Sequence, residues 1–217
     1  KAKELNKDAD VVVCPTFVCL PAAVEAAKGS AVKVGAQNIH WADNGAFTGE
    51  ISGEMLKEIG AQYVIIGHSE RRQYFGETDE TVNSRLKAAL KYELNPIVCV
   101  GETLEEREKG ITNKVLETQT KGALKDISAD DASNLVIAYE PVWAIATGEN
   151  ATPKQAEEIA KFIKEHLAKI YDITEGEIIL LYGGSLKPNI AKEIFEKTHI
   201  DGGLIGGAAL KVADFKG

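Results

Sequence analysis

The chain has 217 residues, of which 44% are hydrophobic, and a formal net charge of −8. This length is enough for one sizeable core, since α/β barrels of about 200–250 residues commonly form one domain. The negative charge argues against binding of a nucleic-acid backbone by the whole surface, but it is compatible with a small anion bound locally. No apolar run approaches the ~18 residues that a membrane span needs.

The three cysteines, Cys14, Cys19 and Cys99, are an odd number, and two of them lie in apolar runs. This pattern favours reduced thiols over a disulfide framework. No signal peptide is visible in the sequence. We therefore expect a cytoplasmic protein with no membrane or nucleic-acid partner.

Seven short apolar runs occur along the chain, and each is continuous rather than alternating, which predicts strands buried on both faces. In chain order they are Val11–Cys14, Val32–Ala36, Tyr63–Gly67, Ile97–Val100, Leu135–Tyr139, Ile178–Tyr182 and Gly203–Ile205. Helical patterns separate the runs and include Asp79–Glu93, Thr103–Leu124 and Pro153–Ile170. Thr152 is predicted to cap the last of these helices, with Pro153 at its first position.

This alternation predicts parallel strands joined by right-handed crossovers. An open doubly wound sheet and an eight-stranded barrel both fit, but no GxGxxG follows an early strand, which counts against a dinucleotide-binding sheet. A barrel of about 250 residues exceeds this chain by about one strand–helix unit. Lys1–Lys7 has the pattern of a helix end, and Lys211–Gly217 that of a helix start. We expect residues 1–217 to form a single (β/α)8 barrel domain without its first strand and parts of its first and last helices.

In both architectures ligands bind where parallel strands end. Gly183-Gly184-Ser185 and Gly206-Gly207 follow the last two strands. Glycine lets backbone N–H groups approach an anion, and the loops after the last two strands of a barrel are a recurrent phosphate site. Ordinary tight turns are the alternative for each pair alone, whereas both pairs on adjacent strands favour phosphate.

His68 and Glu140 each follow a predicted strand directly. A carboxylate at the end of a buried strand is partly desolvated, which raises its pKa towards that of a useful general base. A helix that starts after His68 lowers the pKa of its imidazole, which can then act as a neutral hydrogen-bond donor. A capping glutamate and a core histidine are the alternatives, and each would prevail for its residue alone.

Pro141–Ala151 lies between Glu140 and the next helix and contains small residues. Small residues around an apolar middle are typical of a lid, and a rigid loop is an equally good interpretation. A phosphate substrate should also meet a cation, and neither Arg71 nor Arg72 is clearly aimed at the site. The missing first strand is the expected source of that cation.

These residues closely resemble the triosephosphate isomerase family, and the resemblance covers essentially the whole chain. The matching motifs are Ala46–Ser52, Gly67–Arg72, Ala138–Ile145, Tyr182–Ser185 and Asp201–Ala208. The resemblance implies interconversion of dihydroxyacetone phosphate and glyceraldehyde 3-phosphate, a step of glycolysis and gluconeogenesis. It also implies a homodimer in which the loop Gln37–Glu50 inserts near the partner's site, with no cofactor and no metal.

By resemblance, Glu140 moves the proton between two carbons and neutral His68 polarises the carbonyl, with Ser69 and Glu70 in support. The residues implied to bind phosphate are Ala146, Ser185, Gly206 and Gly207. The rest of the implied lid is Pro141, Val142, Trp143, Ala144, Ile145, Thr147 and Gly148.

Two departures from the family pattern stand out. The family's first strand supplies a substrate-binding Asn and a catalytic Lys, and nothing here matches that element. In the lid, Ala146 replaces a usual Gly and Glu149 replaces a usual Lys or Arg, which predicts slower or altered lid motion. Two other hypotheses are an inert truncated barrel and a different sugar-phosphate isomerase, and the match at Glu140 and His68 disfavours the second.

Overall fold

The computed structural model describes residues 9–132, 135–147 and 151–216. It consists of two compact units, the first formed by residues 1–66 and 80–97 and the second by residues 67–79 and 98–217. The helix end predicted at Lys1–Lys7 lies outside the described residues, as do Gly148 and Glu149 of the predicted lid. None of the described helices is long and apolar enough to cross a membrane.

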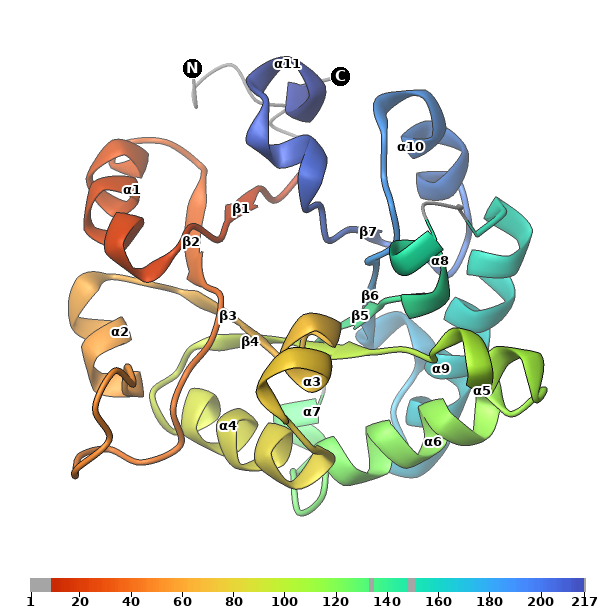
Figure 1. Ribbon diagram of the computed structural model, residues 1–217, viewed down its shortest axis with the longest axis horizontal. Helices are drawn as coiled ribbons and strands as arrows, with labels where there is room; N and C mark the ends of the chain where they lie inside the picture. The colour runs from red at the N-terminus through yellow and green to blue at the C-terminus, as the bar shows by residue number, and fades with distance from the viewer. Residues whose placement is uncertain (1–8, 133–134, 148–150, 217) are drawn as a thin grey trace. The chain divides into compact units, whose positions relative to one another are not determined.

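Seven strands form a sheet in which each strand is hydrogen-bonded to the next one along the chain (Figure 1). They are β1 (Val12–Val13), β2 (Lys33–Ala36), β3 (Tyr63–Ile66), β4 (Asn95–Val100), β5 (Val136–Tyr139), β6 (Ile179–Tyr182) and β7 (Gly202–Gly203). A doubly wound sheet reverses its strand order at a switch point. The sequential order found here therefore excludes that alternative.

The first unit contains two parallel pairings, β1 with β2 and β2 with β3. Its helical segments are η2 (Phe17–Cys19), α1 (Leu20–Ala27), α2 (Gly53–Ile59) and α4 (Asp79–Lys91) from residue 80 onward. Ser52 caps α2 by accepting a hydrogen bond from the N–H of Met55, and Gly60 ends α2 in the left-handed region at φ +94°. In α4, Val82, Leu86 and Ala89 recur at helical spacing and are buried, while Leu90 is half-buried.

The second unit contains the parallel pairings of β5 with β6 and of β6 with β7. Its helical segments are α3 (Ser69–Phe75), α5 (Leu104–Glu108), α6 (Thr112–Ala123), α7 (Ala129–Ala132), α8 (Val142–Thr147), α9 (Pro153–Tyr171), η3 (Glu175–Glu177), α10 (Pro188–Phe195), η4 (Gly207–Leu210) and α11 (Val212–Lys216). Thr152 and Gln155 form a reciprocal capping box at the start of α9, and Pro153 opens the helix, as predicted.

Several predicted boundaries differ from the structure by one or two residues, and two predicted elements differ in a way that has a structural cause. The single helix expected over Thr103–Leu124 is two helices, α5 and α6, because Gly110 between them adopts a left-handed conformation at φ +68°. The last strand is β7 at Gly202–Gly203 rather than Gly203–Ile205. Leu204 keeps one bond to β6, from its N–H to the carbonyl oxygen of Tyr182 at 3.0 Å, and the chain then leaves the sheet.

Candidate active site

The side chain of Glu140 is the buried centre of the candidate site. It follows β5, and the β5–β6 register places it beside Gly183. Its carboxylate accepts hydrogen bonds from the N–H of Ser69 at 2.9 Å and from the Ser69 hydroxyl at 3.1 Å. The same carboxylate lies 2.9 Å from Nε2 of His68. Glu140 is 1% exposed, so these contacts replace its hydration.

His68 is the N-cap of α3, which begins where the sequence predicted a helix start. Its Nδ1 accepts a hydrogen bond from the N–H of Glu70 at 3.2 Å, so the proton of a neutral ring is on Nε2 and points to Glu140. The expected direction of its pKa shift is wrong, however. Burial lowers the pKa of His68, but the hydrogen bond and charge of Glu140, with the charges of Glu70 and Glu77, outweigh burial and raise it.

The remaining charged residues of α3 contribute less directly to this centre. The Glu70 side chain is 67% exposed and its carboxylate lies 3.8 Å from Nδ1 of His68. Arg71 pairs with Glu77 at 2.5 Å, and Arg72 pairs with Asp79 at 2.7 Å. Both guanidinium groups are therefore engaged by carboxylates, which agrees with the interpretation that neither is aimed at a substrate.

Gly101, Gly183 and the thiol of Cys99 enclose Glu140. The sequence did not predict that any of them would contact this residue. A Cβ at Gly183 would lie 2.8 Å from Cγ of Glu140, and a Cβ at Gly101 would clash with the carbonyl oxygen of Glu140. Cys99 is fully buried, and its pKa is raised by burial first and then by the charge of Glu140 and a hydrogen bond with it. The close approach depends on strand register, which single-residue patterns do not reveal.

Three of the four residues predicted to bind phosphate follow β6 and β7, which come after β5 in the sheet order, and the fourth, Ala146, lies in α8 after β5. Ser185 is half-buried in the loop after β6. Gly206 and Gly207 are exposed at the start of η4, with no atom within 4 Å of the position of a Cβ. This open backbone leaves room for an anion to approach the N–H groups.

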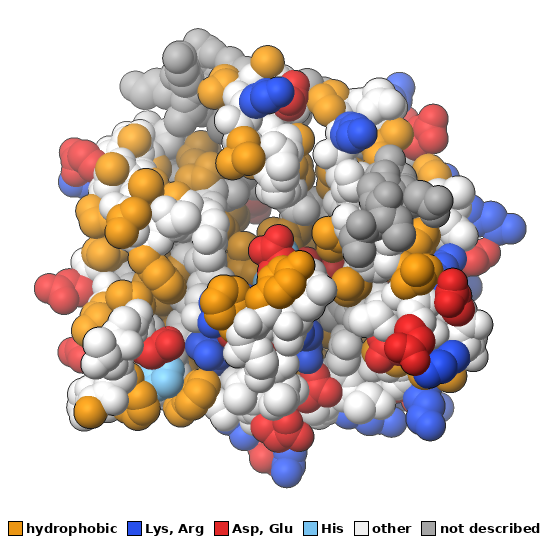
Figure 2. Space-filling model, in the orientation of Figure 1, with side chains coloured by type: hydrophobic (Ala, Val, Ile, Leu, Met, Phe, Trp, Pro, Cys, Tyr) orange, Lys and Arg blue, Asp and Glu red, His pale blue; other side chains and the backbone are white. Residues whose placement is uncertain are grey.

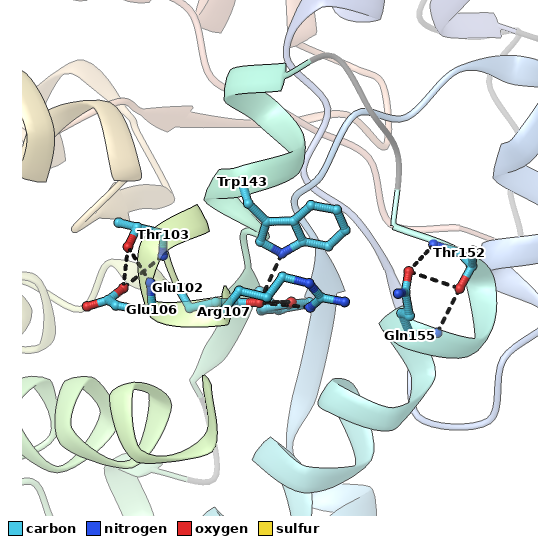
Figure 3. Close-up of polar contacts among 8 residues, drawn as sticks. Glu102, Thr103, Glu106, Arg107, Trp143, Thr152 and Gln155 are labelled. Carbon is cyan, nitrogen blue, oxygen red and sulfur yellow. Dashed lines mark hydrogen bonds and ion pairs between the residues drawn. The ribbon is translucent and has the colours of Figure 1, made fainter. Parts of the chain in front are cut away.

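The segment predicted as a lid or a rigid loop begins as a short helix, α8, directly after Glu140 and Pro141. Trp143 is buried there, and its indole N–H donates to Glu102 at 2.9 Å, while the Arg107 guanidinium lies 4.1 Å from the indole ring centroid (Figure 3). Arg107 also contacts the Glu102 carboxylate at 3.3 Å. The hydroxyl of Tyr139 donates to Glu102 at 3.2 Å.

Glu102 is thus the buried anchor of the start of α8. Burial is the largest cause that raises its pKa, and the hydrogen bonds from Tyr139 and Trp143 oppose the shift. The backbone carbonyl of Glu102 also accepts from the N–H of Val142 at 3.1 Å. No role was predicted for Glu102, although its place two residues after the end of β4, like that of His68 after β3, was a usable signal.

Among the residues that the structure describes, no three His, Cys, Asp or Glu side chains are grouped so that they could hold a metal ion. The chemistry available at the site is that of a buried carboxylate, an imidazole with a hydrogen-bonding Nε2, and open glycine backbone. Together with parallel strands in sequential order, these groups define an acid–base enzyme of the α/β-barrel class.

Comparisons with known proteins identify the family. Residues 1–217 match the family model described as "Triosephosphate isomerase". The chain is 56% identical to a triosephosphate isomerase of Acetivibrio thermocellus over 100% of this chain and 86% of the relative, and 56% identical to one of Clostridium botulinum over 98% and 87%. A crystal structure of triosephosphate isomerase from Bartonella henselae matches with a TM-score of 0.86 at 42% identity, covering 94% of this chain and 83% of that one. The chain belongs to the triosephosphate isomerase family.

Family membership confirms the predicted fold class, the (β/α)8 barrel, with seven strands among the described residues. It also favours the isomerase over the inert-fragment hypothesis, because the similarity extends over most of the length of the relatives. The single-domain organisation and the roles of individual site residues stay predictions.

Proposed function

We propose that the protein is a triosephosphate isomerase that interconverts dihydroxyacetone phosphate and glyceraldehyde 3-phosphate. Family membership supports the reaction and the class of substrate, a small triose phosphate. The observation that carries the assignment of residues is the 2.9 Å contact between the buried Glu140 carboxylate and Nε2 of His68. An acid–base pair of this kind is what proton transfer next to a carbonyl requires.

In the proposed mechanism Glu140 removes a proton from the carbon next to the substrate carbonyl. The electron pair forms an enediolate, and the N–H at Nε2 of His68 donates a hydrogen bond to the developing oxygen charge. Glu140 then delivers the proton to the neighbouring carbon. In the same step the substrate's hydroxyl proton passes, through Nε2 of His68, to the former carbonyl oxygen, so that both residues return to their starting protonation states. A carboxylate base with a neutral imidazole electrophile is the pairing established for this family.

The position of Glu140 seen here is a resting position in this proposal. The carboxylate is held by the N–H and hydroxyl of Ser69 and by His68. To reach a substrate carbon it must exchange these hydrogen bonds for contact with the substrate. The substrate carbonyl then takes the place of the carboxylate at Nε2 of His68, which removes the main cause of its raised pKa and favours the neutral imidazole.

The phosphate group is proposed to bind to the backbone of Gly206 and Gly207, with Ser185 and the backbone N–H of Ala146. The open backbone at the start of η4 supports this placement. The predicted lid is proposed to close over the substrate by movement of the residues after Trp143, because the anchor formed by Glu102 and Trp143 fixes its start.

We also propose a homodimer formed through the loop Gln37–Glu50. Trp41 and Phe47 are 43% and 44% exposed, and their rings lie 4.3 and 4.4 Å from the ring of His40. Asp43 accepts a hydrogen bond from the hydroxyl of Tyr92 at 2.7 Å, which ties the loop to the turn directly after α4. On the face drawn in Figure 2, hydrophobic side chains gather over the first unit around α1 and α2.

Analytical ultracentrifugation tests the dimer, and a monomer at all concentrations would contradict it.

A cytoplasmic location remains part of the proposal. It is supported by the three cysteines, each a free thiol in the structure. Cys99 is completely buried, and burial raises the pKa of Cys14 to about 12, so both thiols are unreactive.

The experiment that tests the function is a coupled assay of the protein with both triose phosphates, beside larger phosphate esters. We expect turnover of the trioses only, and loss of about 10²–10⁴-fold in kcat for Glu140→Gln, because general-base catalysis contributes that much. Preference for a larger ester would favour the other sugar-phosphate isomerase hypothesis. Full activity of Glu140→Gln would show that the base is wrongly assigned.

A further inference from the structure

The side-chain amide of Gln119 on α6 holds the backbone of Gly101 at two points. The N–H of Gly101 donates to Oε1 of Gln119 at 2.8 Å. In return, Nε2 of Gln119 donates to the carbonyl oxygen of Gly101 at 3.0 Å. Gly101 lies just beyond the end of β4, so the amide satisfies one backbone donor and one acceptor as a neighbouring strand would.

The other side of Gly101 lies directly against the backbone of Glu140. A Cβ at Gly101 would clash with the carbonyl oxygen of Glu140 and would lie 2.7 Å from its carbonyl carbon and 3.3 Å from its Cα. The residues on either side of Gly101 bond to the same segment. The N–H of Glu140 donates to the carbonyl oxygen of Val100 at 2.8 Å, and the N–H of Val142 donates to that of Glu102 at 3.1 Å.

Residues 100–102 therefore form one wall against which the backbone of Glu140 rests. Val100 is fixed as the last residue of β4, and the Glu102 side chain is fixed by Tyr139 and Trp143. Between them, Gln119 supplies two side-chain hydrogen bonds to Gly101 from a different element, α6. A displacement of about 1 Å at a reacting group costs about 10²-fold in rate, so the support of this wall matters for the chemistry.

We propose that Gln119 is a positioning residue for the reaction: it clamps Gly101, and Gly101 fixes the backbone from which the Glu140 carboxylate swings. The inference rests on the proposed role of Glu140 as the base. Gln119 itself contacts Gly101 through its amide and takes no part in proton transfer.

The test is Gln119→Met, which keeps a side chain of similar length but removes both hydrogen bonds. The matched control is Thr118→Ala, one position earlier on the exposed side of α6. Four quantities are measured for each variant: kcat, KM, the inhibition constant of inorganic phosphate, and the midpoint of thermal unfolding. We expect kcat of Gln119→Met to fall about 10- to 100-fold, with KM and phosphate inhibition within about 3-fold of wild type. Thr118→Ala should match wild type in kcat.

A kcat of Gln119→Met within about 2-fold of wild type would overturn the proposal, and so would an equal loss in kcat and in phosphate affinity. If Gln119→Met does not fold, Gln119→Glu replaces it. The introduced carboxyl group regains its donor to Gly101 when it is protonated, so kcat relative to wild type should rise as the pH falls from about 7 to 5, towards the ordinary glutamate pKa of about 4.3. A flat ratio would overturn the proposal. Full activity of Glu140→Gln would instead mean that the proposed function fails.

Discussion

The two ends of the candidate site are built in opposite ways. At one end Glu140 is buried, and its carboxylate accepts hydrogen bonds from Ser69 and contacts His68. At the other end Gly206 and Gly207 are exposed, with empty space where side chains would be. The protein's own contacts fix the first end, whereas the second end leaves its backbone open, as the proposed phosphate site requires. Changes at the base should therefore alter kcat, and changes at the open backbone should alter KM.

Matched glycine substitutions give the strongest test of this difference between the enclosed carboxylate and the open backbone. In Gly183→Ala the new Cβ would lie 2.8 Å from Cγ of Glu140 and 3.2 Å from the backbone oxygen of Tyr139, so the base must shift. We expect a fall in kcat of about 10²-fold, because catalysis depends on placement to about 1 Å. Steady-state kinetics measure the effect.

Gly207→Ala is the control at the open end, since no atom lies within 4 Å of its new Cβ. We expect unchanged stability, a kcat within about 2-fold of wild type, and a KM raised by about 3- to 10-fold as the methyl group crowds a bound phosphate. The comparison fails if Gly183→Ala raises KM alone or if Gly207→Ala lowers kcat alone.

A substitution in the anchor formed by Glu102 and Trp143 tests a second difference. This difference is between the fixed start of the lid segment and the part that is proposed to move. Trp143→Phe removes the indole N–H that donates to the buried Glu102 at 2.9 Å. We expect the free energy of unfolding to fall by about 1–3 kcal/mol, because a buried carboxylate loses one of its donors. Chemical denaturation measures it.

A double-mutant cycle isolates this interaction. Trp143→Phe and Glu102→Gln should show a coupling energy of about 1 kcal/mol, whereas Trp143→Phe and Glu108→Gln, an exposed glutamate of α5, should be additive within about 0.5 kcal/mol. Additivity of the first pair would show that Glu102 does not anchor the segment.

The smallest expected effect is a change in the pKa of His68. The pKa of His68 is raised mainly by Glu140, so Glu140→Gln should lower it, and an NMR titration of the ring protons measures the difference. The ion pair stabilises the fold most fully below about pH 6.5, and that stabilisation is lost as the pH rises through the raised pKa. An unchanged pKa in Glu140→Gln would show that the carboxylate does not control the imidazole.

The sequence predicted that Glu140 and His68 lie at one site and that a helix begins at Ser69, because these residues come at the ends of apolar strands, where barrels bind ligands. It did not predict that Gly101 and Gln119, 18 positions apart, are hydrogen-bonded beside the backbone of Glu140. That arrangement depends on the packing of α6 against the end of β4, which hydrophobic periodicity does not encode. The break at Gly110 was missed because the apolar pattern continues across it, although the glycine itself was a signal.

The most direct measurement follows the transferred proton itself. The protein is incubated with dihydroxyacetone phosphate in D₂O, and ¹H NMR monitors deuterium in the glyceraldehyde 3-phosphate formed. The proton on the Glu140 carboxyl group exchanges with solvent while the enediolate is bound. The account therefore predicts that the wild-type protein introduces deuterium at the carbon that receives the proton, and that Glu140→Gln does so at least about 100-fold more slowly. Deuterium incorporation by Glu140→Gln at the wild-type rate would contradict the assignment of Glu140 as the base.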